Sequence, residues 1–225
     1  MEYMYLFICL LLFIPWGIIF YFNKDLRRKM LLSGLIAIPF GAVNIWYRID
    51  YWDPPEVLFL YFISLEDILF GFSITGISIA IYDALFTKEL ITVEKKRTKT
   101  LLFLFPLFIM SFFILNNVLG INSMFMWSIP MFVFAIIIII IRNDLLIPSI
   151  VTGALVSIII IPIYILLFNY IAPDYWDTYW FLTGSKYDVK IFGNVLIVEL
   201  MQYFSYGCFA GIVYDFTKGK KKVAK

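Results

Sequence analysis

The amino-acid sequence predicts an all-α integral membrane protein of about seven transmembrane helices, built from two parallel three-helix repeats plus a connecting helix. Three observations lead to this prediction: an apolar composition, an alternation of basic connecting segments, and short strings that recur in both halves. The 225 residues are 63% hydrophobic and 15% charged, with a mean hydropathy of +0.92. Water-soluble domains do not have this balance, so we expect lipid around the chain.

Composition also narrows the functional classes. Histidine is absent, which excludes histidine-based metal sites, imidazole triads and histidine proton relays. The net charge is only +2, so a nucleic-acid partner is not indicated. Cys9 and Cys208 both lie in apolar runs, where we expect neither a disulfide framework nor a zinc site. We therefore expect no metal and no other cofactor.

Seven apolar stretches are long enough to cross the ~30 Å hydrocarbon layer. They run over residues 4–22, 31–47, 57–86, 100–117, 123–141, 146–171 and 190–216. The chain begins with an acidic residue where a signal peptide carries basic ones, so we expect its first stretch to be a retained helix. Residues 1–225 are interpreted as a single membrane domain.

Basic residues mark one side of the predicted membrane. The segments after the first, third, fifth and seventh stretches hold fifteen of the eighteen lysines and arginines, against Arg48, Lys186 and Lys190 on the other side. Basic residues favour the cytoplasm. This predicts a multi-pass protein of the cell membrane with an odd number of spans, its amino terminus outside and its basic tail, residues 218–225, in the cytoplasm.

Short strings recur in the same order in both halves of the chain. Asp25-Leu26 followed by Gly34 returns as Asp144-Leu145 followed by Gly153, Asp50-Tyr51-Trp52-Asp53 returns as Asp174-Tyr175-Trp176-Asp177, and Tyr82-Asp83 returns as Tyr214-Asp215. This pattern predicts a parallel duplication, with repeat 1 over residues 1–87, a connecting helix over 100–117, and repeat 2 over 123–217. Functional sites of such proteins usually lie between the halves.

Three carboxylates are candidate functional groups, because a charge in hydrocarbon is costly. Glu66 and Asp67 are expected nine or ten residues into the third helix, and Glu199 at a similar depth in the seventh. A low-dielectric site favours the protonated form of a carboxyl group, which is then a proton donor. The alternative is that these acids are structural and pair with polar groups such as Tyr203 or Asn44.

The two Asp-Tyr-Trp-Asp strings have two interpretations. Two carboxylates three residues apart on a helical turn can share a magnesium ion, although such spacing is common. Tryptophan and tyrosine are enriched at membrane interfaces. We therefore favour an aromatic and acidic rim on the outer face, with the aromatic residues Trp46, Tyr47, Tyr51, Trp52, Tyr175, Trp176, Tyr179 and Trp180. Asp83 and Asp215 are expected to be interfacial residues that fix helix depth.

Residues 44–86 combine a tryptophan-containing loop, a Glu-Asp pair and an aromatic-rich helix closed by a Tyr-acid pair. The residues that carry this pattern are Leu65, Glu66, Asp67, Phe70, Tyr82 and Asp83. The pattern resembles the lycopene cyclase domain of the bacterial, archaeal and fungal membrane type. That family has two three-helix units, as two subunits or as one fused chain of about seven helices. The family has a proline before the acid pair, whereas this chain has Ser64 at that position. The corresponding run in the second half of this chain has one acid, Glu199, in place of two.

The resemblance implies an enzyme of carotenoid biosynthesis, an intramolecular lyase of the isomerase class and of the lycopene beta-cyclase type. An acid protonates a terminal double bond of a linear carotene, the carbocation closes a ring, and a base removes a proton. The reaction is redox-neutral and its substrate is a lipid-soluble polyene or isoprenoid among the membrane lipids. The resemblance suggests Glu66 as the general acid, with Asp67 and Glu199 as second acid or base.

Two other functional classes stay open. A proton-coupled small-solute transporter would also use intramembrane acids in repeated units, although the third and seventh helices have no internal proline. A non-catalytic isoprenoid-binding membrane protein would suit the divergent second half. A retinal protein is excluded, because no lysine lies between Asn194 and Tyr214. The sequence leaves open whether copies of the chain form a homo-oligomer.

Overall fold

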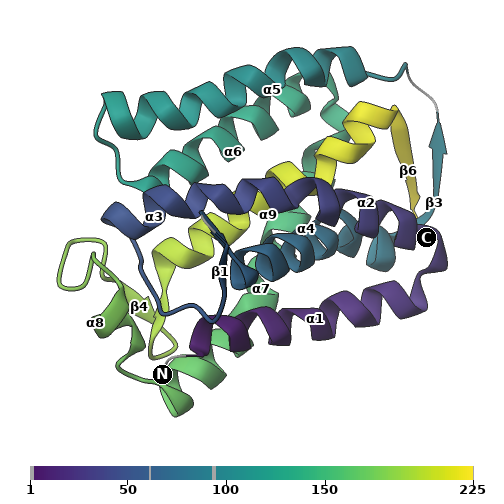
Figure 1. Ribbon diagram of the computed structural model, residues 1–225. Coiled ribbons are helices and arrows are strands. Elements are labelled where there is room, and N and C mark those ends of the chain that lie inside the picture. Colours follow the sequence, from purple (N-terminus) through teal and green to yellow (C-terminus); the bar gives the residue numbers. More distant parts are fainter. Residues whose placement is uncertain (1–2, 61, 93–94, 225) are drawn as a thin grey trace. The chain divides into compact units, whose positions relative to one another are not determined.

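The computed structural model describes residues 3–60, 62–92 and 95–224, and it is mostly helical (Figure 1). The α-helices are α1 (Met4–Phe22), α2 (Arg27–Ala37), α3 (Asn44–Asp50), α4 (Leu65–Phe86), α5 (Thr98–Phe113), α6 (Ser123–Ile141), α7 (Leu146–Ile165), α8 (Tyr175–Tyr179) and α9 (Ile197–Lys218). Short 3-10 or π turns are η1 (Lys24–Leu26), η2 (Ile38–Val43), η3 (Ile114–Val118), η4 (Asn143–Leu145) and η5 (Leu166–Ile171). The strands are β1 (Phe59–Leu60), β2 (Ile63–Ser64), β3 (Thr87–Thr92), β4 (Lys190–Ile191), β5 (Val195–Leu196) and β6 (Lys220–Ala224).

Six helical segments among the described residues are long and apolar enough to cross a membrane. They are Met4–Phe22, Lys24–Asp50, Leu65–Phe86, Thr98–Val118, Ser123–Ile141 and Asn143–Ile171, and they correspond to the first six predicted stretches. The seventh stretch corresponds to α9. This helix is 22 residues long, as α4 is, but its sequence is less apolar.

Two of the predicted helices begin later than expected. Residues 57–64 and 190–196 contain the antiparallel hairpins β1–β2 and β4–β5 instead of helix. In the second hairpin Phe192 and Gly193 have φ values of 49° and 92°, a turn conformation that a right-handed helix does not contain. The all-α expectation is therefore wrong at these segments, because an apolar run alone does not separate a short strand from a helix.

The same order of elements occurs twice along the chain. The series α1, η1, α2, η2, α3, β1, β2, α4 and β3 is followed, after α5 and η3, by α6, η4, α7, η5, α8, β4, β5, α9 and β6. Each hairpin leads directly into a long helix, and each long helix is followed by a strand.

The chain folds into two compact units that do not coincide with the sequence halves. The first unit comprises Met1–Ile77 and Ser157–Met201, and the second comprises Ser78–Val156 and Gln202–Lys225. Each unit therefore contains segments from both halves of the sequence, and α4, α7 and α9 each contribute one end to each unit.

Matched glycines bring helices close together inside each unit. In the first unit, a Cβ atom added to Gly34 of α2 would lie 2.9 Å from the carbonyl oxygen of Phe72 in α4. In the second unit, a Cβ atom added to Gly153 of α7 would lie 2.7 Å from the carbonyl oxygen of Phe204 in α9. Small residues at such positions allow helix backbones to pack directly against one another.

A buried ion-pair cluster ties the chain's last strand into the second unit. β6, in the predicted basic tail, pairs antiparallel with β3 (Figure 1). Lys222 on β6 contacts the carboxylates of Asp83 and Asp215, and all three side chains are buried. The sequence did not predict this ion pair with a distant lysine, and the expected interfacial role of the two aspartates stays a prediction.

Candidate functional site

The three predicted acids all lie in the first unit, at the starts of two long helices. Glu66 and Asp67 are the second and third residues of α4, and Glu199 is the third residue of α9. All three are buried. Their expected position nine or ten residues into a helix is wrong, because the hairpins precede α4 and α9. The first turn of a helix nevertheless favours acidic side chains through its exposed N–H groups.

Asp67 closes a capping box at the start of α4. The Ser64 hydroxyl accepts a hydrogen bond from the Asp67 N–H at 3.0 Å, and Asp67 Oδ2 accepts one from the Ser64 N–H at 2.8 Å. This reciprocal pair satisfies two N–H groups that a helix start otherwise leaves unbonded. The Ser-x-x-Asp spacing is visible in the sequence and would have identified this structural role.

The other contacts of Asp67 come from three polar side chains of the first unit. Asp67 Oδ1 accepts hydrogen bonds from the Tyr5 hydroxyl at 2.9 Å and from Asn44 Nδ2 at 2.6 Å. Arg48 Nη2 lies 3.6 Å from Asp67 Oδ2. The Asn44 partner is the one considered in the structural interpretation of the acids. Both carboxylate oxygens of Asp67 are therefore occupied.

Arg48 also pairs with Glu56, in the segment between α3 and β1. Burial, together with the nearby Asp67 carboxylate, raises the pKa of Glu56, while Arg48 opposes this shift. A single guanidinium thus serves two carboxyl groups. Sequence reasoning did not identify Glu56 or Arg48 as part of this cluster.

Glu66 differs from Asp67 in having one free carboxyl oxygen. Its Oε1 accepts a hydrogen bond from the Val57 N–H at 2.8 Å. Its Oε2 is buried and has no hydrogen-bond partner among the described residues. On the other side of the residue, Cys9 Sγ donates to the Glu66 backbone carbonyl at 3.3 Å. Glu66 is therefore a buried carboxyl with one oxygen that no described residue hydrogen-bonds.

Glu199 is held between two tyrosines. The Tyr51 hydroxyl donates a hydrogen bond to Glu199 Oε1, and the Tyr164 hydroxyl donates to Oε2 at 2.8 Å. Both tyrosines are buried, and burial, followed by the Glu199 carboxylate, raises the pKa of Tyr51. Tyr51 was noted in the sequence but interpreted as part of the rim, and no local pattern pointed to Tyr164.

The two Asp-Tyr-Trp-Asp strings meet inside the first unit, where the rings of Trp52 and Tyr175 are 6.4 Å apart, and the residues that follow the second string extend this contact. Trp52 and Trp180 form an isolated antiparallel bridge, and the Phe181 N–H donates to the Tyr51 carbonyl at 3.0 Å. The rim interpretation is wrong for four of the predicted aromatic residues. Tyr51, Tyr175, Trp176 and Trp180 are buried. They pack on one another and on neighbouring rings, such as the Trp176–Phe168 pair at 4.6 Å.

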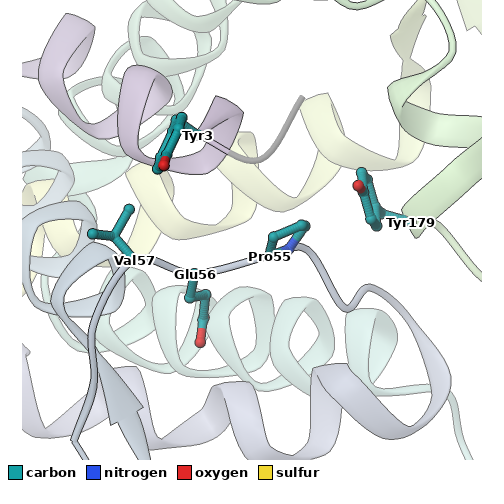
Figure 2. A pocket seen from close by; sticks show the side chains of 5 residues that line it. All are labelled: Tyr3, Pro55, Glu56, Val57 and Tyr179. Carbon is teal, nitrogen blue, oxygen red and sulfur yellow. The ribbon is translucent and has the colours of Figure 1, made fainter.

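A pocket of about 410 Å³ lies beside this cluster and is lined by Tyr3, Pro55, Glu56, Val57 and Tyr179. Figure 2 shows the Glu56 side chain directed to the opposite side of the 55–57 segment from Val57 and Pro55. None of the three predicted acids lines this pocket. The Val57 N–H that bonds Glu66 nevertheless connects the pocket wall to the buried acid.

The three acids thus have distinct surroundings. Within the described ranges, both Asp67 oxygens have partners, Glu199 accepts one phenolic hydrogen bond on each oxygen, and one Glu66 oxygen has no hydrogen-bond partner. No protein-family model, curated protein or solved structure matches the chain. Function is therefore proposed from the chemistry of these groups.

Proposed function

We propose that the chain is a membrane-embedded cyclase of the lycopene cyclase type. It would close a ring at the end of a linear carotene or related isoprenoid by acid catalysis, without redox change. The observation that carries this proposal is the buried Glu66 carboxyl with a free oxygen. The same unit holds another buried carboxyl, Glu199, whose two oxygens accept hydrogen bonds from tyrosine hydroxyls.

Glu66 is the general acid of the proposed reaction. Its O–H bond breaks as the proton is added to the terminal double bond of the polyene, which leaves a carboxylate and a tertiary carbocation. An internal double bond then attacks the cation and closes the ring. A group suited to this step needs a free oxygen in a site shielded from water, and Glu66 Oε2 meets both conditions.

Glu199 is the base that completes the reaction. It removes a proton from a ring carbon, and the released electron pair forms the new ring double bond, so no oxidant or reductant is consumed. Tyr51 and Tyr164 fix the carboxylate by one hydrogen bond on each oxygen and leave lone pairs available. The rings of Tyr5 and Trp52, 4.7 Å apart, offer aromatic faces that attract a carbocation.

Asp67 is a positioning residue in this proposal. Its four contacts, with Ser64, Tyr5, Asn44 and Arg48, leave no oxygen free for substrate. By closing the capping box it fixes the first turn of α4, and hence the direction of the adjacent Glu66.

We further propose that α9 is a seventh membrane span and that the chain consists of two parallel repeats. The repeated order of elements and the matched Gly34–Phe72 and Gly153–Phe204 contacts support this arrangement. In this proposal the amino terminus lies outside the cell membrane and β6 on the cytoplasmic side, an orientation that the distribution of basic residues supports.

Expression in a lycopene-accumulating bacterium, followed by pigment chromatography, tests this function. We expect cyclic carotenes from the wild-type chain and none from Glu66→Gln or Glu199→Gln. The exposed Glu89 provides a matched control, and Glu89→Gln retains conversion. Untouched lycopene in cells whose membranes contain the folded wild-type chain would contradict lycopene as the substrate.

A proton-coupled carrier is a second candidate, favoured by one observation. Glu56, which lines the pocket, is linked through Arg48 to Asp67, and Asp67 to Tyr5. Such a series of titratable groups could relay protons. Proteoliposomes that acidify under an imposed proton gradient, and that stop doing so in Glu56→Gln, would favour this candidate over the cyclase.

A further inference from the structure

Two asparagines tie the end of α7 to the hairpin that leads into α9. Asn169 lies in η5, directly after α7, and Asn194 lies directly before β5. Asn169 Nδ2 donates to the Phe192 carbonyl at 2.7 Å, and Asn169 Oδ1 accepts from the Asn194 N–H at 2.7 Å. Asn194 returns the contact, because its Nδ2 donates to the Phe168 carbonyl at 2.8 Å. Asn169 and Asn194 together are called the asparagine clamp below.

The clamp holds a turn that the chain does not adopt easily. Phe192 has a φ of 49°, in the left-handed region that is unfavourable for a residue with a side chain. Such a conformation persists only where its surroundings hold it, and Asn169 bonds the backbone on both sides of the turn. Gly193 lets the amide approach, since an added Cβ atom would lie 2.5 Å from Asn169 Nδ2. The position of the β4–β5 turn is therefore set from the end of α7.

The clamp and the hydrogen bond between Tyr164 and Glu199 join the same two parts of the chain. Tyr164 is five residues before Asn169, and Glu199 is five residues after Asn194. The Tyr164 hydroxyl donates to Glu199 Oε2 at 2.8 Å. The distance between the end of α7 and the start of α9 is thus set by the clamp on one side of this hydrogen bond.

Trp176 of α8 connects the clamp directly to the tyrosine. Its indole N–H donates to the Asn194 carbonyl at 2.8 Å, and its ring lies 5.6 Å from the Tyr164 ring. The Trp176 side chain is buried, so it has little room to turn. A hydrogen bond weakens steeply when its length or angle changes. The direction of the Tyr164 hydroxyl therefore depends on the same indole that bonds the clamp.

We propose that the asparagine clamp positions Glu199 by holding the Tyr164 hydroxyl on its Oε2. When the clamp is removed, the turn relaxes, the start of α9 shifts from α7, and Glu199 keeps its hydrogen bond from Tyr51. A carboxylate held on one oxygen can rotate, so it spends less time in the geometry that accepts a proton from substrate. This effect on cyclisation rests on the proposed function, whereas the effect on the Glu199 carboxyl does not.

Infrared spectroscopy of the purified full chain tests this role without requiring turnover. The bands of the Glu199 carboxyl are identified by their loss in Glu199→Gln. Tyr164→Phe then gives the shift that one lost hydrogen bond produces. We expect Asn169→Ala to shift these bands in the same direction as Tyr164→Phe, and to add no shift when the two substitutions are combined.

Asn194→Ala is the milder variant, and it serves if Asn169→Ala fails to fold. It removes one side-chain donor but keeps the backbone N–H that bonds Asn169, so we expect a smaller shift in the same direction. Asn117 gives the matched control, because it is the fourth residue of η3 as Asn169 is the fourth of η5. Its exposed side chain bonds the Phe113 carbonyl of the preceding helix, and Asn117→Ala should leave the Glu199 bands unchanged.

The pigment assay measures the consequence for the proposed reaction. We expect Asn169→Ala to lower conversion per folded molecule about tenfold, as the loss of one hydrogen bond implies. Unshifted Glu199 bands in folded Asn169→Ala and Asn194→Ala chains would overturn the positioning role and show that the clamp serves the fold alone. Shifted bands in a chain whose wild type leaves lycopene untouched would refute the proposed function and leave the clamp standing.

Discussion

Lys222 Nζ lies 2.6 Å from Asp215 Oδ2 in the second unit, and the same ammonium group contacts the Asp83 carboxylate. Two buried acids thus share one lysine of β6. The strand pairing of β6 with β3 and this ion pair act together, because both anchor the same five-residue strand.

Replacement of Lys222 by methionine should destabilise the protein by about 3–5 kcal/mol, because two buried carboxylates lose the ammonium group that they share. Unfolding in detergent, followed by circular dichroism, measures the change. The neighbouring Lys221 is exposed, so Lys221→Met should change stability by less than about 0.5 kcal/mol. Equal effects of the two substitutions would show that the ion pair contributes nothing.

Ser64→Ala and Asp67→Asn should each lower the free energy of unfolding by about 1–2 kcal/mol, because each opens the capping box of α4. The double variant should lose less than the sum, since both changes remove the same reciprocal hydrogen bonds. A double-variant loss that equals the sum would mean that the two residues act separately.

A comparison of Asp67→Asn with Glu66→Gln separates a positioning role from a catalytic role. In the pigment assay we expect Asp67→Asn to retain measurable conversion per folded molecule, whereas Glu66→Gln abolishes it at near wild-type stability. Complete inactivity of a folded Asp67→Asn chain would assign Asp67 a direct role in proton transfer.

Gly34→Val and Gly153→Val should each destabilise the protein by about 1–3 kcal/mol, because a larger side chain meets the backbone carbonyl of the opposing helix. Gly17 in α1 has no atom within 4 Å of an added Cβ. Gly17→Ala should therefore be neutral or stabilise the helix by about 0.5–1 kcal/mol. Thermal unfolding of the three variants in one detergent makes the comparison, and a tolerated valine at both Gly34 and Gly153 would contradict close helix packing there.

Alkaline conditions should destabilise the wild-type chain more than Tyr175→Phe. Burial raises the pKa of Tyr175 above its ordinary value of 10.0. In the unfolded chain this phenol ionises near pH 10, whereas in the fold it stays neutral, so its contribution to stability is complete below pH 10 and is lost as the pH rises above it. Chemical unfolding from neutral pH to above pH 10 should give a shallower loss for Tyr175→Phe by up to about 1.4 kcal/mol per pH unit. An unchanged slope, matching that of the control Tyr170→Phe at an exposed tyrosine, would show that Tyr175 already ionises in the fold.

The sequence predicted the apolar helices well because hydrocarbon imposes a length and composition that a single stretch displays. It misplaced the starts of α4 and α9, since each hairpin contains a strand, Phe59–Leu60 or Val195–Leu196, that is as apolar as the helix that follows. The Ser64-x-x-Asp67 spacing and the Phe192-Gly193 turn were the signals that could have corrected both starts.

The candidate site was predicted only in its acids. Glu66, Asp67 and Glu199 stood out because isolated carboxyls are rare in apolar runs, and they all lie in the first unit. Their partners Tyr51 and Tyr164 could not be assigned, because aromatic residues are common in membrane proteins and a single tyrosine carries no local signature of burial. The Lys222–Asp215 pair was missed for a related reason, since a lysine in a basic segment gives no sign of a distant partner.

The hydrogen bond between Tyr51 and Glu199 joins residues 148 positions apart, which has a consequence for synthesis. The first four helices leave the ribosome well before Glu199 is made, so the nascent chain carries Glu66 and Asp67 in an incomplete unit until α9 arrives. Such non-local pairing slows folding. A chain divided between α5 and α6 into two fragments would rebuild the carboxyl cluster only where both fragments occupy the same membrane together.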